Sequence, residues 1–458
     1  MTDGAQTTSG PAVEPAGGWP NGRRATGTAA PYSSELAREL ASETLERFLR
    51  YVRIDTQSQR ARSSCPSTPG QLELGALLVS ELRELGLADA EQDANGYVFA
   101  TLPASGPVPE RPMVGLLAHL DTSPDAPGAG VEPLIHRAYD GSTIELPRGG
   151  TRLDPATMPE LRDRLGHDIV TGSGDTLLGA DDKAGIAAIM GALRYLASHP
   201  ELPRPPLRVG FTPDEEIGEG ATLFDLERFG ASCAYTIDGS ELGELQDETF
   251  SALEAVLTVI GVDVHPGQAT GKLVNALRLG GRILAELPAE LSPERTAGRE
   301  GFIHPYAISG GAGRAELRLI LRDFDDERLE QHRALLERIA RQVLAAEPRA
   351  RLELEVREQY RNMRRHLERF PEVIAAAERA IRAEGIEPRR TPIRGGTDGS
   401  RLSAMGLPTP NLFNGGHEYH SPREWISVQD LAAAAAVIVR LAGEWAKAAG
   451  ASAREATR

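Results

Sequence analysis

Residues 112–121 read Pro-Met-Val-Gly-Leu-Leu-Ala-His-Leu-Asp, an apolar run that follows a proline and ends on polar residues. Its length and its boundaries predict a buried strand. The chain continues with helical apolar spacing over residues 182–198, and short apolar runs recur at residues 207–211 and 234–237. Strands that alternate with helices of this length predict an α/β fold, built on a mostly parallel sheet with both faces covered.

The middle of the chain has another order of elements, β-α-β-β-α-β, which is the ferredoxin-like pattern of a small α+β domain. These elements are predicted, in order, at residues 253–264, 272–287, 302–309, 315–321, 325–344 and 352–356. We therefore expect a catalytic domain in two segments with a second domain inserted between them. The predicted divisions are a disordered tail (1–34), the first catalytic segment (35–249), the inserted domain (250–361), the second catalytic segment (362–447) and a flexible C-terminus (448–458).

The overall charge limits the partners that the protein can have. Its 458 residues carry a formal net charge of −16. Nucleic acids and anionic membranes attract basic surfaces, so we expect neither as a partner. The apolar stretch at residues 431–442 has the length of a packed helix, and we find no signal peptide. Cys65 and Cys233 make no disulfide framework in a chain of this size. We therefore expect a cytoplasmic protein, and the acidic charge favours an enzyme with a small-molecule substrate.

Acidic and imidazole side chains gather where the predicted strands end. They are His119 and Asp121, Asp181, Glu215 and Glu216, Asp238 and, in a late loop, His420. In an open α/β sheet, such strand ends face one crevice. Each residue alone has a common structural explanation, such as a helix cap or a surface acid. Several carboxylates in one crevice would repel one another in a low dielectric, however, and bound cations remove that conflict.

A charge count favours two divalent cations. Asp181, Glu216 and Asp238 supply three negative charges, and a bridging hydroxide supplies a fourth. His119 and His420 then add one neutral nitrogen donor to each metal ion.

Two further acids in these motifs are left for other roles. Glu215 stands beside the metal water, where a general base belongs. Asp121 comes two residues after His119 and is placed to accept the second ring proton of that histidine, which would fix its tautomer. The residues themselves thus predict a two-metal hydrolase.

Several strings together resemble the peptidase T group, the tripeptide aminopeptidases within the dinuclear zinc exopeptidase family. The strings are His-Leu-Asp-Thr-Ser-Pro-Asp (119–125), Leu-Leu-Gly-Ala-Asp-Asp-Lys-Ala-Gly (177–185), Phe-Thr-Pro-Asp-Glu-Glu-Ile-Gly (211–218), Ile-Asp-Gly-Ser-Glu (237–241), Val-His-Pro-Gly (264–267), Leu-Arg-Asp-Phe-Asp (321–325), Arg-Gly-Gly-Thr-Asp-Gly (394–399) and Pro-Asn-Leu-Phe (410–413). The resemblance extends over residues 36–447. It implies a zinc-exopeptidase catalytic domain with an inserted domain of the lid or dimerisation type.

The resemblance also implies which residues hold the metal ions. One zinc ion would be bound by His119, Asp181 and Asp238. The other would be bound by Asp181, Glu216 and His420, so that Asp181 is the bridge. Two zinc ions per chain are expected, with cobalt or manganese as substitutes, and Glu215 would activate the bridging water.

Residues outside the metal motifs would act on the peptide. By the resemblance, His265 stabilises the tetrahedral oxyanion, while Arg322 and Arg394 hold the terminal carboxylate of the peptide. Asn275 would contact the same end of the substrate. Closure of the inserted domain would bring His265 and Arg322 onto the peptide. Whether His265 serves its own subunit or a neighbouring one in a homodimer stays open.

The implied reaction is removal of the N-terminal residue from short peptides such as tripeptides. The nearest alternative is a dipeptidase, a carboxypeptidase or an N-acyl amino acid deacylase with the same metal core, because metal ligands do not separate these activities. A non-catalytic peptide-binding protein is a remote alternative that the intact Glu215 disfavours. His417 lies three residues before His420, but the flanking glycines and Pro422 indicate a loop and not the helix of a His-Glu-x-x-His motif, so we do not expect it to be a ligand.

Overall fold

The first helix begins at a serine cap that also ties the start of the described chain to the body. The computed structural model describes residues 31–106 and 111–447. Ser34 accepts a hydrogen bond from the backbone N–H of Ala37 and starts α1 (Glu35–Tyr51). The hydroxyls of Ser33 and Ser34 donate to the buried carboxylate of Glu384. Of the segment predicted as a tail, residues 31–34 thus contact the body, while residues 1–30 and the predicted C-terminus lie outside the described residues.

The body is organised around an eight-stranded mixed sheet of order β1-β2-β8-β3-β9-β16-β10-β15. Its central strands β8, β3, β9 and β16 run parallel, whereas β1, β2 and β10 each have an antiparallel partner. Every residue of β3 is buried, which is why this strand reads as a continuous apolar run. The strands are β1 (Glu91–Gln92), β2 (Val98–Leu102), β3 (Val114–His119), β8 (Leu207–Thr212), β9 (Cys233–Gly239), β10 (Glu244–Gln246), β15 (Arg389–Arg390) and β16 (Asn411–Phe413).

Helices cover both faces of this sheet, as the alternation of elements predicts. Successive residues of a strand point to opposite faces, and Leu116 and Leu117 of β3 accordingly belong to different apolar clusters. On the Leu116 side, α1 packs against α4 and α11, and α9 packs against α11. On the other side, α5 and α10 contribute Phe229 and Leu402. The helices of the body after α1 are α2 (Pro69–Glu84), α3 (Pro159–Arg162), α4 (Ala180–Ser198), α5 (Leu226–Phe229), α8 (Arg364–Leu367), α9 (Pro371–Ala383), α10 (Asp398–Ala404) and α11 (Val428–Lys447).

A smaller four-stranded sheet of order β17-β18-β7-β4 completes the body, with a separate β5-β6 pair. Its strands are β4 (Leu134–His136), β7 (Ile169–Thr171), β17 (Gly416–His417) and β18 (Trp425–Ser427), and the pair consists of β5 (Ile144–Glu145) and β6 (Arg152–Leu153). His417, predicted in a loop, lies in the short strand β17. Its ring is buried and stacks on Trp425 at a centroid distance of 4.2 Å.

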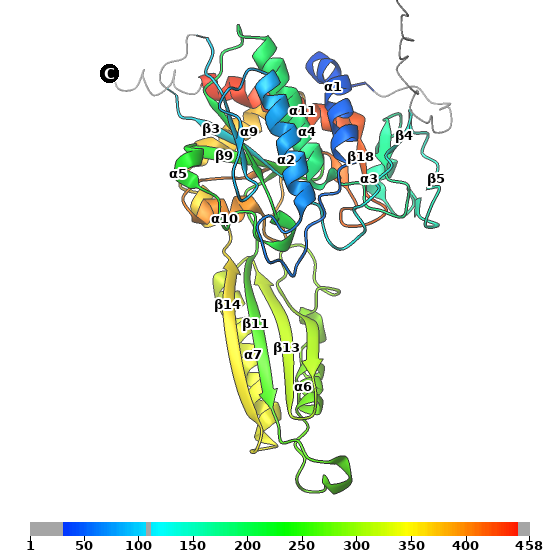
Figure 1. Ribbon diagram of the computed structural model, residues 1–458, viewed down its shortest axis with the longest axis vertical. Helices are drawn as coiled ribbons and strands as arrows, with labels where there is room; N and C mark the ends of the chain where they lie inside the picture. The colour runs from blue at the N-terminus through cyan, green and yellow to red at the C-terminus, as the bar shows by residue number, and fades with distance from the viewer. Residues whose placement is uncertain (1–30, 107–110, 448–458) are drawn as a thin grey trace, which may run out of the picture.

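A narrow unit extends from one side of the body and is made from the middle of the chain (Figure 1). It has the predicted β-α-β-β-α-β order, and its antiparallel sheet of order β12-β13-β11-β14 is ferredoxin-like. The elements are β11 (Ser251–Ile260), α6 (Ala276–Ala285), β12 (Phe302–Gly310), β13 (Arg314–Asp323), α7 (Asp326–Ala345) and β14 (Arg351–Tyr360), with single turns η2 (Pro266–Gln268) and η3 (Ala289–Leu291). We call this unit the lid. The predicted α/β fold class with an inserted α+β domain is confirmed.

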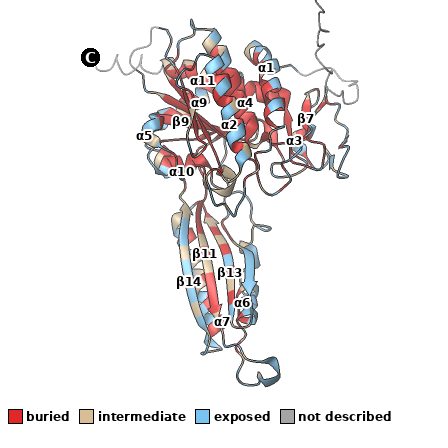
Figure 2. Cartoon of the chain, in the orientation of Figure 1, coloured by how far each residue is buried: buried red, intermediate tan, exposed pale blue. Residues whose placement is uncertain are grey.

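Three strands of the lid are longer than their local sequence pattern predicts, whereas β11 ends at Ile260, four residues before its predicted end. The pattern ends one strand at residue 356, whereas β14 reaches Tyr360, where it pairs with Ala252 of β11. The ladder to a neighbouring strand therefore extends an element beyond its apolar alternation. Helices α6 and α7 cover one face of the sheet, while alternate residues of β14 and the outer part of β12 stay exposed (Figure 2).

None of the helices in the described part of the chain combines the length and the apolar character that a membrane span requires. The apolar stretch at residues 431–442 lies within α11, which packs against α1, α4 and α9 as a helix of the body.

Candidate metal centre and catalytic cavity

Five side chains from distant parts of the chain meet at the carboxyl ends of the central strands. His119 ends β3, Asp181 lies in the first turn of α4, Glu216 follows β8, Asp238 lies at the end of β9, and His420 follows β17. They form two groups, His119 with Asp181 and Asp238, and Asp181 with Glu216 and His420. Within each group, the possible ligand atoms lie within 4.8 Å of one another. The structure thus brings together all five residues that the sequence singled out as ligands.

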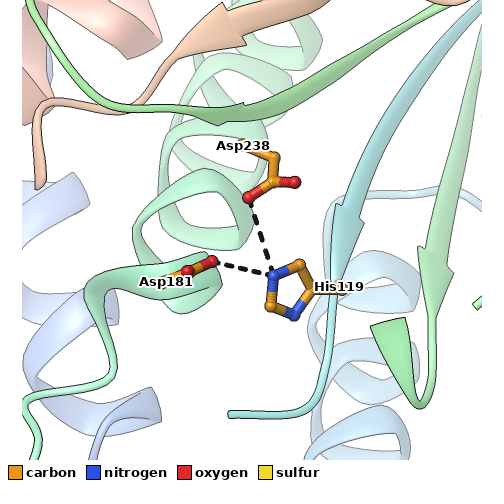
Figure 3. Close-up of side chains that lie close together, drawn as sticks. All are labelled: His119, Asp181 and Asp238. Carbon is orange, nitrogen blue, oxygen red and sulfur yellow. Dashed lines mark hydrogen bonds and ion pairs between the residues drawn. The ribbon is translucent and has the colours of Figure 1, made fainter. Parts of the chain in front are cut away.

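The first group is centred on one imidazole nitrogen. His119 Nε2 lies 2.9 Å from Asp181 Oδ1 and 3.6 Å from Asp238 Oδ1 (Figure 3). The three residues come from two neighbouring strands and from the start of the helix between them in sequence. One nitrogen and two carboxylate oxygens that converge in this way are a donor set that zinc accepts.

The second group shares Asp181 with the first. His420 Nε2 lies 3.2 Å from Asp181 Oδ2 and 2.9 Å from Glu216 Oε2. The two oxygens of Asp181 therefore face different histidines, which is the arrangement that a bridging carboxylate requires. Glu216 Oε1 is buried and has no hydrogen-bond donor among the described residues. A cation would supply the partner that this oxygen lacks.

The pKa values of the cluster reflect the repulsion among its buried carboxylates and their attraction to the two histidines. Burial, followed by repulsion from Asp181, raises the pKa of Glu216 to about 8. Burial also raises the pKa of Asp238 to about 7. Burial alone would lower the pKa of His420, but hydrogen bonds to Asp181 and Glu216 raise it to about 11. Burial opposes the charge of His119 as well, yet its carboxylate neighbours raise the pKa of this histidine well above the usual value. Divalent cations stabilise such a cluster because they offset its negative charge without protons.

Asp121 connects the histidine motif to the acidic turn. The Nδ1 atom of His119 lies 2.9 Å from the backbone oxygen of Asp121 and 3.4 Å from its carboxylate. The same carboxylate accepts the backbone N–H groups of Glu215 at 2.9 Å and Glu216 at 3.1 Å. The side chain is fully buried. The backbone oxygen of Asp121 thus orients the ring, whereas its carboxylate, which the sequence predicts as the acceptor of the ring proton, fixes the turn that carries the two glutamates.

A strained residue turns the two glutamates into the crevice. Asp214 has a left-handed backbone (φ 59°) directly before the single turn η1 (Glu215–Ile217). Its buried carboxylate accepts hydrogen bonds from Ser67 and from Gln71 Nε2 (2.8 Å). Glu215 lies outside both ligand groups and lines the adjacent cavity. Burial, with Asp238 nearby, raises the pKa of Glu215 well above its usual value, which suits a group that takes up a proton.

The start of α4 is held by a glutamate that sequence reasoning missed. Glu424 is 1% exposed, and its carboxylate accepts the backbone N–H groups of Leu178 (2.7 Å), Gly179 (2.7 Å) and Asp181 (3.0 Å). These contacts join residues more than 240 positions apart, so no local pattern could reveal them. Glu424 therefore positions the backbone of Asp181, the residue that both candidate ligand groups share.

Asp182 holds the neighbouring elements together around Asp181. Its carboxylate accepts the backbone N–H of His119 at 3.3 Å, the backbone N–H of Gly185 at 3.1 Å and the side-chain N–H of Asn414 at 3.0 Å. A Cβ on Gly185 would lie 2.3 Å from the backbone oxygen of Ile237 and 2.4 Å from Asp182. Glycine at this position therefore allows α4 to approach β9, which carries Asp238.

A cavity of about 470 Å³ adjoins the cluster and is bounded by the body and by the base of the lid. Asp181, Glu215, Glu216, Asp238 and His420 form one wall. The other lining residues include Arg60, Ile320, Arg322, Gln359, Tyr360, Gly395, Gly396, Thr397, Asp398 and Arg401. The volume suits a small molecule such as a short peptide.

The two arginines predicted to hold a carboxylate differ in their surroundings. Arg322 lines the cavity, its Nη1 donates to the backbone oxygen of Arg394 at 3.2 Å, and its buried Nε has no acceptor among the described residues. Arg394 points elsewhere, because its guanidinium donates to the backbone oxygens of Gly298 (2.9 Å) and Glu300 (2.8 Å) and to Thr296 Oγ1 (2.9 Å). Arg322 can thus meet a ligand in this arrangement, while Arg394 anchors the chain that leads into β12.

His265 and Asn275 are not brought to the metal centre of their own chain. The base of the lid lines the cavity, and β11 leads away from it (Figure 1). This ten-residue strand spans roughly 30 Å, and both residues lie in the loop beyond its far end, where Val262 pairs with Val274. His265 is exposed and Asn275 caps α6 by accepting the N–H of Arg278 at 3.0 Å. The structure therefore places these two predicted residues in one loop at the far end of the lid, and not near the cluster.

An α/β body with a ferredoxin-like insertion and an acidic cluster on its strand ends defines a metal-dependent hydrolase. A model of "Peptidase family M20/M25/M40" matches residues 177–444. The protein called Peptidase T from Geobacillus kaustophilus (strain HTA426) is 47% identical over 403 residues, which cover 88% of this chain and 98% of the relative. The chain belongs to peptidase family M20/M25/M40 and is a metallopeptidase.

Solved structures share the fold. The crystal structure of aminopeptidase PepT from Bacillus cereus ATCC 10987 has a TM-score of 0.68 at 22% identity. The tripeptidase from Staphylococcus aureus subsp. aureus mu50 has a TM-score of 0.70 at 20% identity. Each comparison covers 89% of this chain and 99% of the other. The body and the inserted lid are therefore the common architecture of these proteins.

Glu424→Gln should loosen the metal centre. The amide has one acceptor oxygen where the carboxylate has two, so the three N–H groups at the start of α4 lose part of their support. Metal affinity should fall about 10- to 100-fold, the usual effect of losing a group that orients ligands. Competition with a chelator, followed by elemental analysis, measures this loss.

Glu418→Gln is the matched control, because Glu418 lies in the same segment and pairs with the exposed Arg423. Its metal affinity should equal that of the wild type. Equal metal affinity in the Glu424 and Glu418 variants would show that Glu424 does not support the centre.

Proposed function

We propose that the protein is a dinuclear zinc aminopeptidase that releases the N-terminal residue from tripeptides and similar short peptides. The observation that carries the proposal is the pair of ligand groups that share Asp181 and adjoin a cavity of peptide size. The Peptidase T name of the relative and the tripeptidase among the solved structures support the substrate class.

The residues of the cluster divide into ligands and a base. His119, Asp181 and Asp238 would hold one zinc ion, and Asp181, Glu216 and His420 the other. Bound there, the two ions supply Lewis-acid polarisation of the scissile carbonyl and of the attacking water. Glu215 takes the proton from that water and returns it to the leaving amine. Its raised pKa favours this uptake, and Asp121 holds the backbone that aims it.

Arg322 would set the length of the substrate. Its guanidinium lies in the wall of the cavity with a free Nε, at the base of the lid. A charged terminal carboxylate is the ligand that a guanidinium binds best. A longer peptide would meet the same guanidinium with an uncharged peptide group, so short peptides are favoured. Arg394 stays a prediction, because its guanidinium would first have to leave the oxygens of residues 296–300.

Product analysis separates this function from the alternatives. A tripeptide with three different residues should yield the free N-terminal residue and a dipeptide. Release of the C-terminal residue first would indicate a carboxypeptidase, and cleavage of N-acyl amino acids alone would indicate a deacylase. Binding without any release would indicate a non-catalytic protein.

Glu215→Ala should keep both metal ions and lower kcat about 100-fold or more, the scale of a lost general base. Metal content and single-turnover rates on one tripeptide measure the two effects separately. Glu219→Ala is the control, since Glu219 lies four residues on and pairs with Arg62. Loss of metal from the Glu215 variant would show that the roles of Glu215 and Glu216 are exchanged.

Arg322→Met should lower kcat/KM far more for peptides with a free terminal carboxylate than for the corresponding amides. Loss of the charged contact should cost about tenfold or more in kcat/KM for free peptides, with little change for the amides. The ratio of the two values of kcat/KM is the measurement. An equal loss for both substrates would remove Arg322 from the carboxylate site.

We further propose that His265 and Asn275 act on the metal centre of a second subunit in a homodimer. Three observations support this proposal. Both residues lie in the loop at the far end of the lid, roughly 30 Å along β11 from the cavity. His265 is exposed and carries no carboxylate partner among the described residues. Among the described residues, the outer strand β12 has one unpaired edge with exposed Tyr306 and Ile308, a surface that a second copy can cover.

Mixing two inactive variants tests this arrangement. In a dimer of His265→Ala with Glu215→Ala, one site contains an intact Glu215 and receives an intact His265 from the other subunit. Random reassociation should then restore about a quarter of the wild-type activity, since half of the dimers are mixed and each has one complete site. If His265 acts within its own subunit, the mixture stays as inactive as its components.

We also propose that the enzyme works in the cytoplasm on peptides, without nucleic-acid or membrane partners. The net charge of −16 and the two free thiols, Cys65 and Cys233, support this location.

A further inference from the structure

Arg401 is a cation in the catalytic cavity that has no role so far. It lies on α10, whose N-terminus is fixed by the capping box of Thr397 and Ser400. Arg401 lines the cavity together with Glu215 and Glu216. The structure describes no hydrogen bond and no ion pair of its guanidinium within residues 31–106 and 111–447. A buried or half-buried guanidinium usually pairs with a carboxylate. Because Arg401 has no such partner among the described residues, its guanidinium is available to a ligand.

The neighbouring acid on the same helix does not explain Arg401. Asp398 is three residues earlier and also lines the cavity, but its carboxylate accepts a hydrogen bond from Thr212 Oγ1 at 2.6 Å. No ion pair within 4.0 Å joins Asp398 to Arg401 in the described chain. Arg401 therefore makes no fixed ion pair with Asp398 among the described residues.

The backbone opposite Arg401 leaves room for its guanidinium. Gly218 has a left-handed conformation (φ 74°), and a Cβ there would lie 3.2 Å from Arg401 Nη2. A side chain at this position would therefore contact the guanidinium and restrict it. Glycine keeps the side of the cavity at Arg401 accessible.

A hydroxyl and a second guanidinium lie on the same wall. The Tyr360 hydroxyl is buried without a hydrogen-bond partner among the described residues. Burial raises its pKa, so the hydroxyl keeps its proton and can donate. The guanidinium carbon of Arg322 lies 6.0 Å from the Tyr360 ring centre. Arg322, Tyr360 and Arg401 thus give this wall three donor groups, with the carboxylates of Asp398 and Glu215 beside them.

A peptide with one carboxylate would satisfy only part of this wall. The proposed function assigns the terminal carboxylate to Arg322. Arg401 then requires a second anionic group on the same substrate. In a short peptide, that group is the side chain of an aspartate or a glutamate, which a guanidinium binds through paired N–H groups.

We propose that Arg401, with the Tyr360 hydroxyl, forms a subsite for a side-chain carboxylate, so that the enzyme prefers short peptides that contain an acidic residue. This inference rests on the proposed function and adds the side-chain preference to it. Arg401 acts on binding and selectivity, and the hydrolytic step remains that of Glu215 and the metal centre.

Kinetics with paired peptides tests the subsite. The substrates are tripeptides based on Ala-Ala-Ala in which each position in turn carries Glu or the uncharged Gln. At one position, the wild-type holoenzyme should show a kcat/KM for the Glu peptide about tenfold above that for the Gln peptide. Arg401→Gln should bring this ratio to within about twofold of one, and Arg401→Lys should keep part of it, because a lysine retains the charge but not the paired N–H groups.

Arg338→Gln is the matched control, since Arg338 is an exposed arginine on α7 of the lid and its loss changes the net charge by the same amount. It should keep the wild-type ratio. Circular dichroism and metal content confirm that each variant is folded and loaded.

Three results would overturn the subsite. They are a wild-type enzyme without a Glu preference at any position, a preference that survives in Arg401→Gln, and an Arg401→Gln variant that discriminates less between free and amidated peptides. The last result would assign Arg401 to the terminal carboxylate. Failure of the wild type to release the N-terminal residue from every peptide would instead contradict the proposed function itself.

Discussion

Repulsion among buried carboxylates is the constraint on which the structure of this peptidase depends. Asp181, Glu216 and Asp238 converge at the ends of parallel strands, where burial makes their charges costly. Two histidines complete the cluster and share the central carboxylate of Asp181. Bound cations would stabilise this arrangement and would polarise a water molecule and a carbonyl group.

The surrounding residues hold this arrangement from several directions. Asp121 binds both the ring of His119 and the backbone of the glutamate turn, and Glu424 binds the backbone at Asp181. Asp214 takes a strained conformation so that the glutamates face the crevice. Each of these carboxylates is buried and satisfied by N–H donors, which makes them supports of the centre and distinguishes them from its ligands.

Much of the fold and of the candidate site could be predicted from the sequence, because the motifs at the strand ends are short and local. Most of the five clustered residues and Glu215 stand in short motifs that follow apolar runs, and the ferredoxin-like insertion follows from the order of such runs, while the division of the cluster into ligands and a base follows from the resemblance to the peptidase T group. Glu424 could not be predicted, since its partners lie in a distant segment and a lone glutamate before a tryptophan has no signature. The surroundings of Arg394 and the position of His265 depend on how the lid meets the body, and a motif does not contain that information. The availability of Arg401 could not be predicted either, because it follows from the absence of a hydrogen bond or an ion pair of its guanidinium among the described residues.

The most direct test of the account is a titration of metal-free protein with Zn²⁺, with bound ions and tripeptide hydrolysis followed in the same samples. The account predicts two ions per chain and activity that appears as the sites fill. A protein that cleaves its tripeptide equally well when stripped of metal, or that binds no ion at this cluster, would contradict it.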